Sequence, residues 1–396
     1  MSGRNFTKIS TNIHLSDPEE DEVNKAKKGT PDYDRLHKIR PMYDEIRQNC
    51  MAHFQPGQNI AVDERMVASR ARIGIRQYMK DKPVKWGFKL FVLADSSCGY
   101  TWDFFVYRGK GHIGSGRGLS YDVVMELVSS PVLGTGYKLF VDNFYTSPML
   151  FRDLLADKKI WACGTIREQR VGFPKHRAGT LNSRDPRGTI RWIREGPLVF
   201  VQWKDTRVVQ MCSSIHKAHS GDTVQRRVKT DGRWRLETFP IPPAVQDYNQ
   251  NMGGVDLSDA LIGYYTILHK TRRWYRTFFY HFVDIGIVNA FILHKEIARS
   301  RGERPMSQKA FRENLVLQLQ EAGHGEIIRP PQPPPAPTTP AVLHMPSYFG
   351  ADGTQARRHC VLCKQKTPLF CSTCEVALCL VPTRNCYTQW HIQKEI

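Results

Sequence analysis

Aspartates stand at the edges of several predicted secondary-structure elements, where a carboxylate can cap a helix or bind a metal ion. Asp142 follows the apolar run 139–141 in KLFVDNFYTS (138–147), at the point where a strand ends and a turn begins. Because burial of an unpaired carboxylate is costly, we expect Asp142 either to cap the next helix or to bind a metal. The residue type alone leaves both alternatives open.

Two further segments carry carboxylates in comparable positions. Asp63 follows the apolar run 60–62, and Asp256 and Asp259 follow a double glycine at the start of a helical pattern. A hard divalent cation takes oxygen ligands from several chain elements, and a two-metal phosphodiester site needs a carboxylate that bridges both ions. We therefore expect Asp63, Asp142 and Asp256 to bind two Mg²⁺ or Mn²⁺ ions, which accept the same oxygen ligands.

Two neighbouring carboxylates have other expected roles. Asp259 lies three residues after Asp256 and shares its helix face, so we expect it to be an accessory metal ligand or to lie just behind the ligands. Glu64 follows Asp63 on a strand, where successive side chains point to opposite faces, and we interpret it as structural. The spacing of the remaining residues suggests no side-chain nucleophile.

The elements that must position these carboxylates alternate between strand and helix over residues 59–170. Aromatic and β-branched residues predict a hairpin of 85–95 with 100–109 around the turn 96–99. The pattern then predicts a helix over 120–130 with Ser120 as its N-cap, a strand over 138–145, a helix over 147–159 with Ser147 as its N-cap, and a strand over 160–168. Pattern alone predicts a mixed α/β fold.

Residues 171–245 depart from this alternation. Short strands that are dense in arginine and tryptophan are predicted over 189–214. Cations and aromatic residues interleave there as on a surface that follows DNA, although an ordinary half-exposed sheet has the same pattern. The residues concerned are Arg191, Trp192, Arg194, Trp203 and Lys204.

Residues 246–322 are predicted to be helical and to carry a basic cluster within LHKTRRWYR (268–276). We expect this cluster to contact phosphates next to the carboxylates; the alternative is a solvated face that covers a buried helix at 278–293. Polar residues interrupt that apolar stretch, which favours a buried helix over a membrane span. The cluster consists of Lys270, Arg272, Arg273 and Arg276.

Six of the ten cysteines follow a proline-rich linker (323–355) and fall within residues 356–396. Two CxxC pairs are followed by further cysteines and a histidine, and paired CxxC spacing in an intracellular chain is typical of zinc binding. Disulfides would need an oxidising compartment. The candidate ligands are Cys360, Cys363, Cys371, Cys374, Cys379, Cys386 and His391.

Composition agrees with a nucleic-acid partner. The chain has 57 Lys and Arg against 38 Asp and Glu, a net charge of +19, and a pI of about 9.6, which favours binding to a polyanion through counterion release. With 396 residues, 41% of them hydrophobic, the chain has room for two or three domains and a sizeable core. No apolar segment follows Met1, so we expect no signal peptide and a soluble, intracellular protein.

The segments VDERM (62–66), VDNFYTS (141–147) and NQNMGGVDLSDALI (249–262) resemble, in order, the three signature blocks of piggyBac-type transposases. The resemblance extends from about Ser2 to the C-terminus. It implies a ribonuclease H-like catalytic core at 59–170, a β-rich insertion at 171–245 and helices at 246–322 that complete the core. It also implies a helical dimerisation and DNA-binding region that is only partial at 1–58, because the family's version starts upstream of Met1.

The same resemblance implies a function. A protein of this family cleaves DNA strands at transposon ends, forms and resolves hairpins, and transfers strands into TTAA sites in the nucleus, with Asp63, Asp142, Asp256 and Asp259 as the catalytic carboxylates. Its partners would be DNA and a second copy of the chain, with neither a membrane nor a small-molecule substrate.

The C-terminal segment resembles the family's cross-brace zinc module, which would recognise terminal-repeat DNA. By the family's order, Cys371, Cys374, Cys386 and His391 would complete one zinc site. The other would contain Cys360, Cys363 and Cys379. Because Pro382 occupies the next expected position and cannot ligate, either His359 or another group would supply the fourth ligand.

Functions of different classes remain open at this point. The complete aspartate set favours an active transposase. The short N-terminus and the missing ligand after Cys379 favour a domesticated, non-catalytic DNA-binding or chromatin-binding protein. A truncated remnant of a decayed element is a third alternative.

Overall fold

The computed structural model describes residues 2–80, 82–109, 114–174, 180–230, 232–323, 344–351 and 355–394. The chain divides into two compact units, Met1–Leu315 and Val316–Ile396, and each is described by itself. Most of the expected proline-rich linker, residues 324–343, lies outside the described residues.

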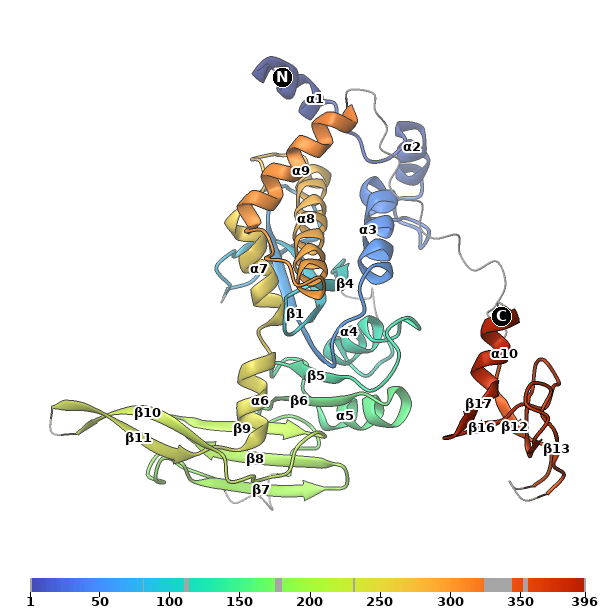
Figure 1. Cartoon of the computed structure of the whole chain (residues 1–396). Helices are drawn as coiled ribbons and strands as arrows, with labels where there is room; N and C mark the ends of the chain where they lie inside the picture. The colour runs from blue at the N-terminus through green and yellow to red at the C-terminus, as the bar shows by residue number, and fades with distance from the viewer. Residues whose placement is uncertain are drawn as a thin grey trace. The chain divides into compact units, whose positions relative to one another are not determined.

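A mixed sheet of nine strands forms the centre of the first unit (Figure 1). The strand order is β2-β3-β1-β5-β6-β9-β8-β7, and β4 also pairs with β3. Strand β1 runs antiparallel to β3 and parallel to β5, which runs parallel to β6. The strands are β1 (Asn59–Ala68), β2 (Arg76–Tyr78), β3 (Trp86–Asp95), β4 (Thr101–Val106), β5 (Lys138–Val141), β6 (Trp161–Thr165), β7 (Ile190–Glu195), β8 (Leu198–Lys204) and β9 (Val208–Ser213). The predicted mixed α/β fold is confirmed.

The predicted hairpin is present as β3 and β4, which pair antiparallel. Both strands are buried along nearly their whole length because helices cover them. Phe88 of β3 stacks on Phe278 of the long helix α8 with ring centroids 4.6 Å apart. Arg47 of helix α3 reaches the buried Asp103 of β4 with two hydrogen bonds of 2.8 and 2.9 Å, so this helix is also tied to the hairpin.

Two helical segments connect the strands around β5. Helix α4 (Leu119–Leu127) precedes β5, and α5 (Pro148–Asp153) continues into the π-helical turn η2 (Leu154–Lys158) before β6. Ser147 caps α5 as predicted, since its Oγ accepts a hydrogen bond of 3.1 Å from the Leu150 N–H. The prediction for Ser120 is wrong: α4 begins one residue earlier, after Gly118, whose φ of 103° is readily adopted only by glycine.

Within residues 171–245, strands β7, β8 and β9 extend the main sheet. Strand β9 pairs with β6, with Cys163 opposite Ser213, and β8 and β7 follow outwards. In the same range β10 (Thr223–Thr230) and β11 (Arg233–Pro240) form a separate two-stranded ribbon. Trp203 and Lys204 are buried, so they do not belong to a DNA-following surface, whereas Arg191, Trp192 and Arg194 on the edge strand β7 are exposed.

Helices flank this sheet at both ends of the unit. They are α1 (Gly3–Thr11), α2 (Pro18–Ala26), the 3₁₀ turn η1 (His37–Ile39), α3 (Arg40–Ala52), α6 (Pro243–Asn251), α7 (Gly254–Tyr264), α8 (Trp274–Ser300) and α9 (Gln308–Gly323). Among the described residues, α8 is long and apolar enough to cross a membrane, but 61% of its apolar window is buried inside the protein, as expected for a core helix. Asn289 anchors it by exchanging hydrogen bonds of 3.0 and 2.8 Å with the backbone of Thr101.

The second unit contains short hairpins and one helix. Its described elements are β12 (Pro346–Tyr348), β13 (Arg358–His359), β14 (Lys366–Thr367), β15 (Leu369–Cys371), β16 (Leu380–Val381), β17 (Arg384–Asn385) and α10 (Cys386–Lys394). Its small core consists largely of cysteine side chains. A core this small points to stabilisation by something other than apolar burial.

Candidate functional site

Asp63 and Asp142 are brought together by the pairing of β1 with β5. The two strands run parallel, and Val62 is the register partner of Val141. Asp63 directly follows Val62, and Asp142 directly follows Val141 at the end of β5. Both side chains therefore lie at the same level of two adjacent strands. The negative charge of Asp142 contributes to the raised pKa of Asp63, as expected for two neighbouring carboxylates.

The structure decides between the two alternatives for Asp142. Its Oδ1 accepts a hydrogen bond of 2.8 Å from the Phe144 N–H, and its carbonyl accepts one of 3.1 Å from the Thr146 N–H, which closes a turn. The following helix is capped by Ser147 instead. Asp142 is therefore a turn residue at a strand end, and the structure does not use it as a helix cap.

Burial and neighbouring negative charges raise the pKa of both carboxylates. The pKa of Asp63 is raised to about 7, first by burial and then by the charges of Glu64 and Asp142, while Lys82 opposes the shift. The pKa of Asp142 is also raised, by burial and by Glu64, against the effect of the Phe144 N–H. A divalent cation would relieve both effects, and an all-oxygen donor set suits Mg²⁺ or Mn²⁺.

Lys82 is a residue of this site that sequence reasoning missed. Its Nζ lies 3.6 Å from Glu64 Oε1 and donates a hydrogen bond of 3.3 Å to the Glu64 carbonyl. Burial would lower the pKa of Lys82, but the charges of four carboxylates raise it. Those carboxylates are Asp63, Glu64, Asp256 and Asp259. No motif surrounds Lys82 in the sequence, so no sequence signal connects it to the aspartates.

The Glu64 carboxylate lies at the site, although its position after Asp63 on the strand predicted the opposite face. Its Oε2 accepts a hydrogen bond of 3.2 Å from the hydroxyl of Tyr145, which is fully buried. Burial alone would raise the pKa of Glu64, yet the charges of Lys89 and Lys82 hold it below its usual range. Glu64 therefore remains ionised, and its hydrogen bond holds the Tyr145 side chain in place, three residues after Asp142.

Helix α7 supplies Asp256 from its first turn, where the side chain is exposed. The helix packs against β1 and β3 because Gly254 lies against the turn that joins β3 to β4. A Cβ at Gly254 would lie 2.9 Å from the Asp95 carbonyl oxygen and 3.1 Å from the Ser96 Cα. This close approach explains one glycine of the double-glycine motif; a Cβ at Gly253 would meet nothing within 4 Å.

Asp259 has a charged partner within the protein. Its carboxylate pairs with the guanidinium of Arg65, which is buried in β1 and also donates a hydrogen bond of 2.8 Å to Ser258. Removing that carboxylate would leave a buried cation without its partner. This ion pair therefore holds α7, the helix that carries Asp256, against β1. The Asp259 carboxylate is engaged by Arg65 in this arrangement.

The three remaining aspartates come from three separate elements: Asp63 from β1, Asp142 from the turn after β5, and Asp256 from α7. Two ions about 3.5–4 Å apart can bridge carboxylates on separate elements.

The predicted basic cluster is only partly exposed. Lys270, Arg272 and Arg273 are exposed in the segment between α7 and α8. Arg276 is 7% exposed and donates a hydrogen bond to the Thr11 carbonyl, so the prediction that it contacts DNA is wrong. Asp256 lies in the first turn of α7, and Tyr264 at its end lies eight residues, or about 12 Å of helix, further along. The exposed cations follow that end of the helix in the chain.

A hydrogen-bonded chain of Ser213, His216 and Asp247 has the order of groups found in serine hydrolases. The Ser213 Oγ lies 2.8 Å from His216 Nδ1, and His216 Nε2 lies 2.9 Å from Asp247 Oδ2. Ser213 is completely buried, and its Oγ accepts a further hydrogen bond of 3.0 Å from the Ile215 N–H. Because no substrate reaches this hydroxyl, the chain ties β9 to α6 and is not a nucleophilic site.

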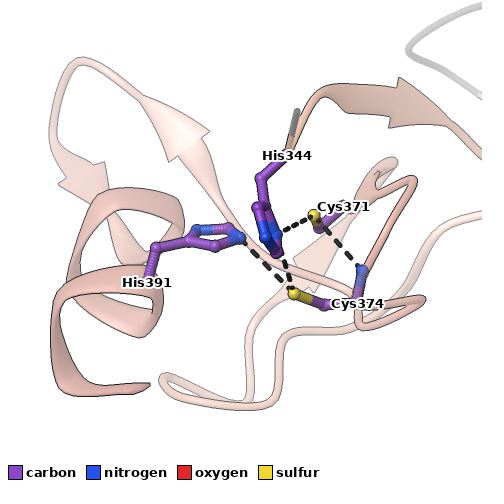
Figure 2. Close-up of side chains that lie close together, drawn as sticks. All are labelled: His344, Cys371, Cys374 and His391. Carbon is purple, nitrogen blue, oxygen red and sulfur yellow. Dashed lines mark hydrogen bonds between the residues drawn. The ribbon is translucent and has the colours of Figure 1, made fainter. Parts of the chain in front are cut away.

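Two groups of four ligands in the second unit could each hold a metal ion. One contains Cys360, Cys363, Cys379 and Cys386, and the other contains His344, Cys371, Cys374 and His391. A tetrahedral zinc ion with Zn–S bonds of about 2.3 Å places its ligand atoms about 3.8 Å apart. Cys363 Sγ lies 3.6 Å from Cys379 Sγ. His344 Nδ1 lies 3.1 Å from Cys374 Sγ, and His391 Nε2 lies 3.6 Å from the same sulfur; both rings point towards it in Figure 2.

The predicted division of these ligands is wrong at Cys386. Strands β16 and β17 form a hairpin in which Leu380 pairs with Asn385, and this folds Cys386 back beside Cys379. Cys386 thereby completes the four-cysteine group. His359 is exposed, and its Nδ1 lies 2.7 Å from the Lys364 carbonyl, so it is not the missing ligand.

His344 is a ligand that sequence reasoning missed, because it was assigned to the linker. Strand β12 pairs with β15, with Pro346 opposite Cys371, and the Ser372 N–H donates a hydrogen bond of 2.9 Å to the Met345 carbonyl. This pairing brings His344 to Cys371 and Cys374. The two groups alternate along the chain, which is a cross-brace arrangement.

Neighbouring groups favour the thiolate form of Cys360 and hold the ring of His391 in place, and both effects favour metal binding. Although burial opposes it, backbone N–H groups of Cys363, Cys379 and Leu362 lower the pKa of Cys360 to about 6. His391 Nδ1 lies 2.7 Å from the Tyr387 carbonyl, which fixes the ring and directs Nε2 towards Cys374. All ten cysteines are free thiols, so disulfides do not compete for these sulfurs.

Comparisons with known proteins show which family this chain resembles. The sequence matches a family described as Transposase IS4 over residues 1–291. Human PiggyBac transposable element-derived protein 3 is 26% identical over 401 aligned positions, which cover 98% of this chain and 63% of that protein. Human PiggyBac transposable element-derived protein 2 is 26% identical over 269 positions, covering 66% of this chain and 45% of that protein.

The fold is similar to that in a cryo-EM structure of the piggyBac transposase synaptic complex with hairpin DNA. The TM-score is 0.71 and the identity 25%, with 96% of this chain and 78% of the other chain covered. The chain spans less than two thirds of the length of the two human relatives. The match over residues 1–291, the relatives and the shared fold together place this chain in the Transposase IS4 family, among the piggyBac-type proteins.

Proposed function

We propose that this chain cleaves DNA strands and transfers them at TTAA sites, using a metal-dependent centre formed by Asp63, Asp142 and Asp256. The observation that carries the proposal is the in-register pairing of β1 with β5, which sets two half-buried carboxylates of raised pKa at one level of the sheet. The third carboxylate is Asp256 of α7, whose charge, like that of Asp63, raises the pKa of Lys82.

A ribonuclease H-like core is part of this proposal. The strand order β4-β3-β1-β5-β6 supports it, with an antiparallel hairpin on one side of β1 and two parallel strands on the other. The aspartates follow the expected order: one on the first strand, one at the end of a later strand, and one on a helix that follows the strand-rich residues 171–245.

Within this centre Asp63, Asp142 and Asp256 would hold Mg²⁺ or Mn²⁺. Bound ions would activate a water or a 3′-hydroxyl and stabilise the leaving oxygen of an in-line displacement at phosphorus. Lys82 adds a positive charge beside these carboxylates, where it can attract a phosphate oxygen of the DNA backbone. Arg65 and Asp259 keep the helix of Asp256 in place.

The partners follow from charge and from the structural relative. A net charge of +19 and the exposed Lys270, Arg272 and Arg273 support DNA as the substrate, which would be transposon ends and a TTAA target. The second unit would bind two Zn²⁺ ions and recognise terminal-repeat DNA. The structural relative is a synaptic complex with hairpin DNA, which also supports DNA as the partner. The chain would act as a homodimer, in the nucleus.

A non-catalytic DNA-binding protein is the second candidate function. It is favoured by the names of the two human relatives, which describe proteins derived from a transposable element. One argument for it is removed, because Cys386 completes the group that lacked a fourth ligand. All four candidate aspartates are present in both cases, so a measurement of DNA strand cleavage is needed to distinguish the two functions.

Strand cleavage by the full, zinc-loaded chain tests the proposal. DNA substrates with TTAA-flanked ends from several related elements would be incubated with Mg²⁺ or Mn²⁺. We expect cutting by the native chain and by Asp153→Asn, whose carboxylate pairs with Arg117 and Tyr121, but not by Asp142→Asn. DNA binding without cutting by any of the three proteins would refute catalysis and favour the second candidate.

A further inference from the structure

Two large aromatic side chains, Tyr78 of β2 and Trp86 of β3, lie exposed side by side at the β2 edge of the main sheet. They are register partners, and their ring centroids are 4.9 Å apart. Tyr78 is 51% and Trp86 50% exposed, so the protein covers only about half of each side chain. We call this pair the aromatic platform, because its open rings offer a surface on which a planar group can stack.

The aromatic platform lies on the same face of the sheet as the Asp63 side chain. Asp63 is the register partner of Val92 on β3, and Trp86 precedes Val92 on that strand by an even number of residues. Alternate residues of a strand share a face, and directly opposed residues of neighbouring strands share it too. Trp86 and its partner Tyr78 therefore lie on the face of Asp63.

The hairpin that carries the platform also reaches the carboxylates. Lys82, whose Nζ lies 3.6 Å from Glu64 Oε1, belongs to the segment between β2 and β3. Along β1, Ala68 lies five residues after Asp63, or about 17 Å of strand, and Ala68 lies beside Trp86. A DNA strand with a phosphate at the carboxylates can therefore reach the platform within a few nucleotides.

A hollow of about 270 Å³ adjoins the platform, and two arginines line it. Its walls are formed by Ala68, Ser69, Arg70, Arg76 and Trp86. The Arg76 guanidinium lies 4.5 Å from the centre of the Trp86 ring. Neither arginine forms an ion pair with a carboxylate of the described residues. The hollow therefore combines an aromatic wall with positive charge that is not neutralised by the protein.

Backbone hydrogen bonds hold this surface in a fixed shape. The Met79 N–H donates one of 2.8 Å to the Lys85 carbonyl, which closes the hairpin next to the two rings. The Ser69 N–H donates one of 3.3 Å to the Trp86 carbonyl and fixes the wall of the hollow. A preformed surface lowers the entropic cost of binding.

This combination of groups fits an unpaired nucleotide. Proteins bind single-stranded nucleic acid by stacking aromatic rings on base faces, while cations contact the phosphates. Inside a duplex the neighbouring bases already cover each base face, so the platform has nothing to stack on. An apolar protein partner would leave both arginines without counter-charges.

We propose that the aromatic platform stacks on one unpaired base of a DNA strand that extends from the metal centre. Arg70 and Arg76 then bind the phosphate of that nucleotide in the hollow. The site distinguishes DNA with an unpaired flank from a continuous duplex. The inference rests on the proposed function in taking DNA as the partner, but it requires no strand cleavage.

Fluorescence anisotropy with the full, zinc-loaded chain, in the absence of Mg²⁺ and Mn²⁺, tests this inference. Two probes are compared: a mixed-sequence duplex, and the same duplex with a short single-stranded overhang. We expect Tyr78→Ala/Trp86→Ala to weaken binding to the overhang probe about tenfold or more, because a stacked base is lost. Binding to the duplex should stay unchanged, which also shows that the variant is folded. Tyr78→Phe/Trp86→Phe keeps both rings and should retain most of the overhang binding.

Trp161→Ala is the matched control for the loss of an exposed tryptophan. Trp161 is 37% exposed and pairs with Lys138 at the start of β5, whereas Asp142 follows the end of that strand. This control should bind both probes as the native chain does. Equal binding of the overhang probe by Tyr78→Ala/Trp86→Ala and the native chain would overturn the inference, as would an equal loss on both probes.

Stacking and phosphate contact have separate readouts. The fluorescence of 2-aminopurine falls when it stacks, so this base in the overhang should be quenched by the native chain and not by Tyr78→Ala/Trp86→Ala. Arg70→Gln/Arg76→Gln should reduce the slope of log K against log salt for the overhang probe by about 1.4, since each phosphate contact on a single strand contributes about 0.7. Quenching by the alanine variant, or an unchanged slope for the glutamine variant, would contradict the inference.

The outcome is distinguishable from that of the proposed catalysis. Failure of Asp142-dependent cutting together with platform-dependent binding of the overhang probe would refute the catalysis and leave the stacking site standing. Asp142-dependent cutting together with equal overhang binding by the alanine variant and the native chain would do the reverse.

Discussion

At the scale of single residues, the carboxylates around Lys82 divide into two kinds. Among the described residues, no buried cation pairs with Asp63, Asp142 or Asp256, and burial raises the pKa of the first two. Asp259 is instead engaged by a buried arginine. This division predicts different consequences for two aspartates that are only three residues apart.

Substitution of Asp256 and of Asp259 should therefore separate catalysis from stability. Asp256→Asn should abolish metal-dependent cutting with almost no change in the free energy of unfolding, because the side chain is exposed. Asp259→Ala should lower that free energy by about 1–3 kcal/mol, because it leaves the Arg65 guanidinium buried without its carboxylate. Urea titrations and the cutting assay measure both effects. Equal stability of the two variants would contradict the roles assigned here.

The sequence identified the individual aspartates but not their surroundings. The apolar runs before Asp63 and Asp142 and the double glycine before Asp256 are local signals, so they could be read from the chain. Lys82 and His344 could not, because each reaches its site only through tertiary pairing of distant segments. The misassignment of Arg276 has the same cause: burial against α1 depends on a contact 265 residues away.

At the scale of elements, the turn between β3 and β4 fixes the start of α7. The Asp95 carboxylate accepts hydrogen bonds from the N–H groups of Gly57, Ser97 and Cys98 at 2.7, 2.8 and 3.0 Å, which holds the turn rigid. Gly254 then packs on that turn. The position of Asp256 thus depends on how closely this helix approaches the turn.

Gly254→Ala should displace α7 and impair the site. The added Cβ would meet the Asp95 carbonyl and the Ser96 Cα, so we expect a loss of about 1–3 kcal/mol in the free energy of unfolding and slower cutting. Gly253→Ala is the control, since its Cβ meets nothing within 4 Å and its φ of −75° suits alanine. Chemical denaturation and cutting rates measure the difference. Equal tolerance of both substitutions would refute the close approach.

The same turn predicts a pH dependence of stability. Burial alone would raise the pKa of Asp95, but hydrogen bonds from Ser97, Gly57 and Cys98 hold it below its usual range. A carboxylate with a lowered folded-state pKa stabilises the protein at pH values above its unfolded pKa, and this contribution is lost as the pH falls through the folded pKa. Asp95→Asn should therefore cost about 1–3 kcal/mol at neutral pH and progressively less below about pH 4. Urea titrations at several pH values test it; a difference that is constant with pH would contradict the assignment.

Element boundaries show which patterns are reliable. Ser147 was correctly predicted as a cap because serine followed by proline is a strong local signal, whereas Ser120 was not, because Gly118 supplies the conformation that starts α4. Strands β7 to β9 were predicted as strands. Their union with the main sheet through β6 is a long-range pairing that local patterns do not encode.

At the scale of the whole molecule, the two units depend on different stabilising interactions. The first has an extensive apolar core, whereas the described core of the second consists largely of metal-ligand candidates. Metal binding is folding free energy in such small modules. The second unit should therefore require metal to fold, and the first should not.

Zinc content measured by mass spectrometry under native conditions tests the ligand assignment. We expect two Zn²⁺ per native chain and one in both Cys386→Ser and His344→Ala, because each removes a ligand from a different group. His359→Ala is the control and should retain two, since this residue lies outside both groups. Retention of two ions by Cys386→Ser, or loss of one by His359→Ala, would contradict the assignment.

Binding of Mn²⁺ to the zinc-loaded full chain, followed by electron paramagnetic resonance, tests the central claim most directly, because it needs no knowledge of the cognate DNA. If Asp63, Asp142 and Asp256 form a two-ion centre, the native chain and Asp153→Asn should bind about two Mn²⁺ ions. Asp142→Asn should lose at least one of them. Equal Mn²⁺ binding by all three proteins would contradict the claim that these aspartates form the metal centre.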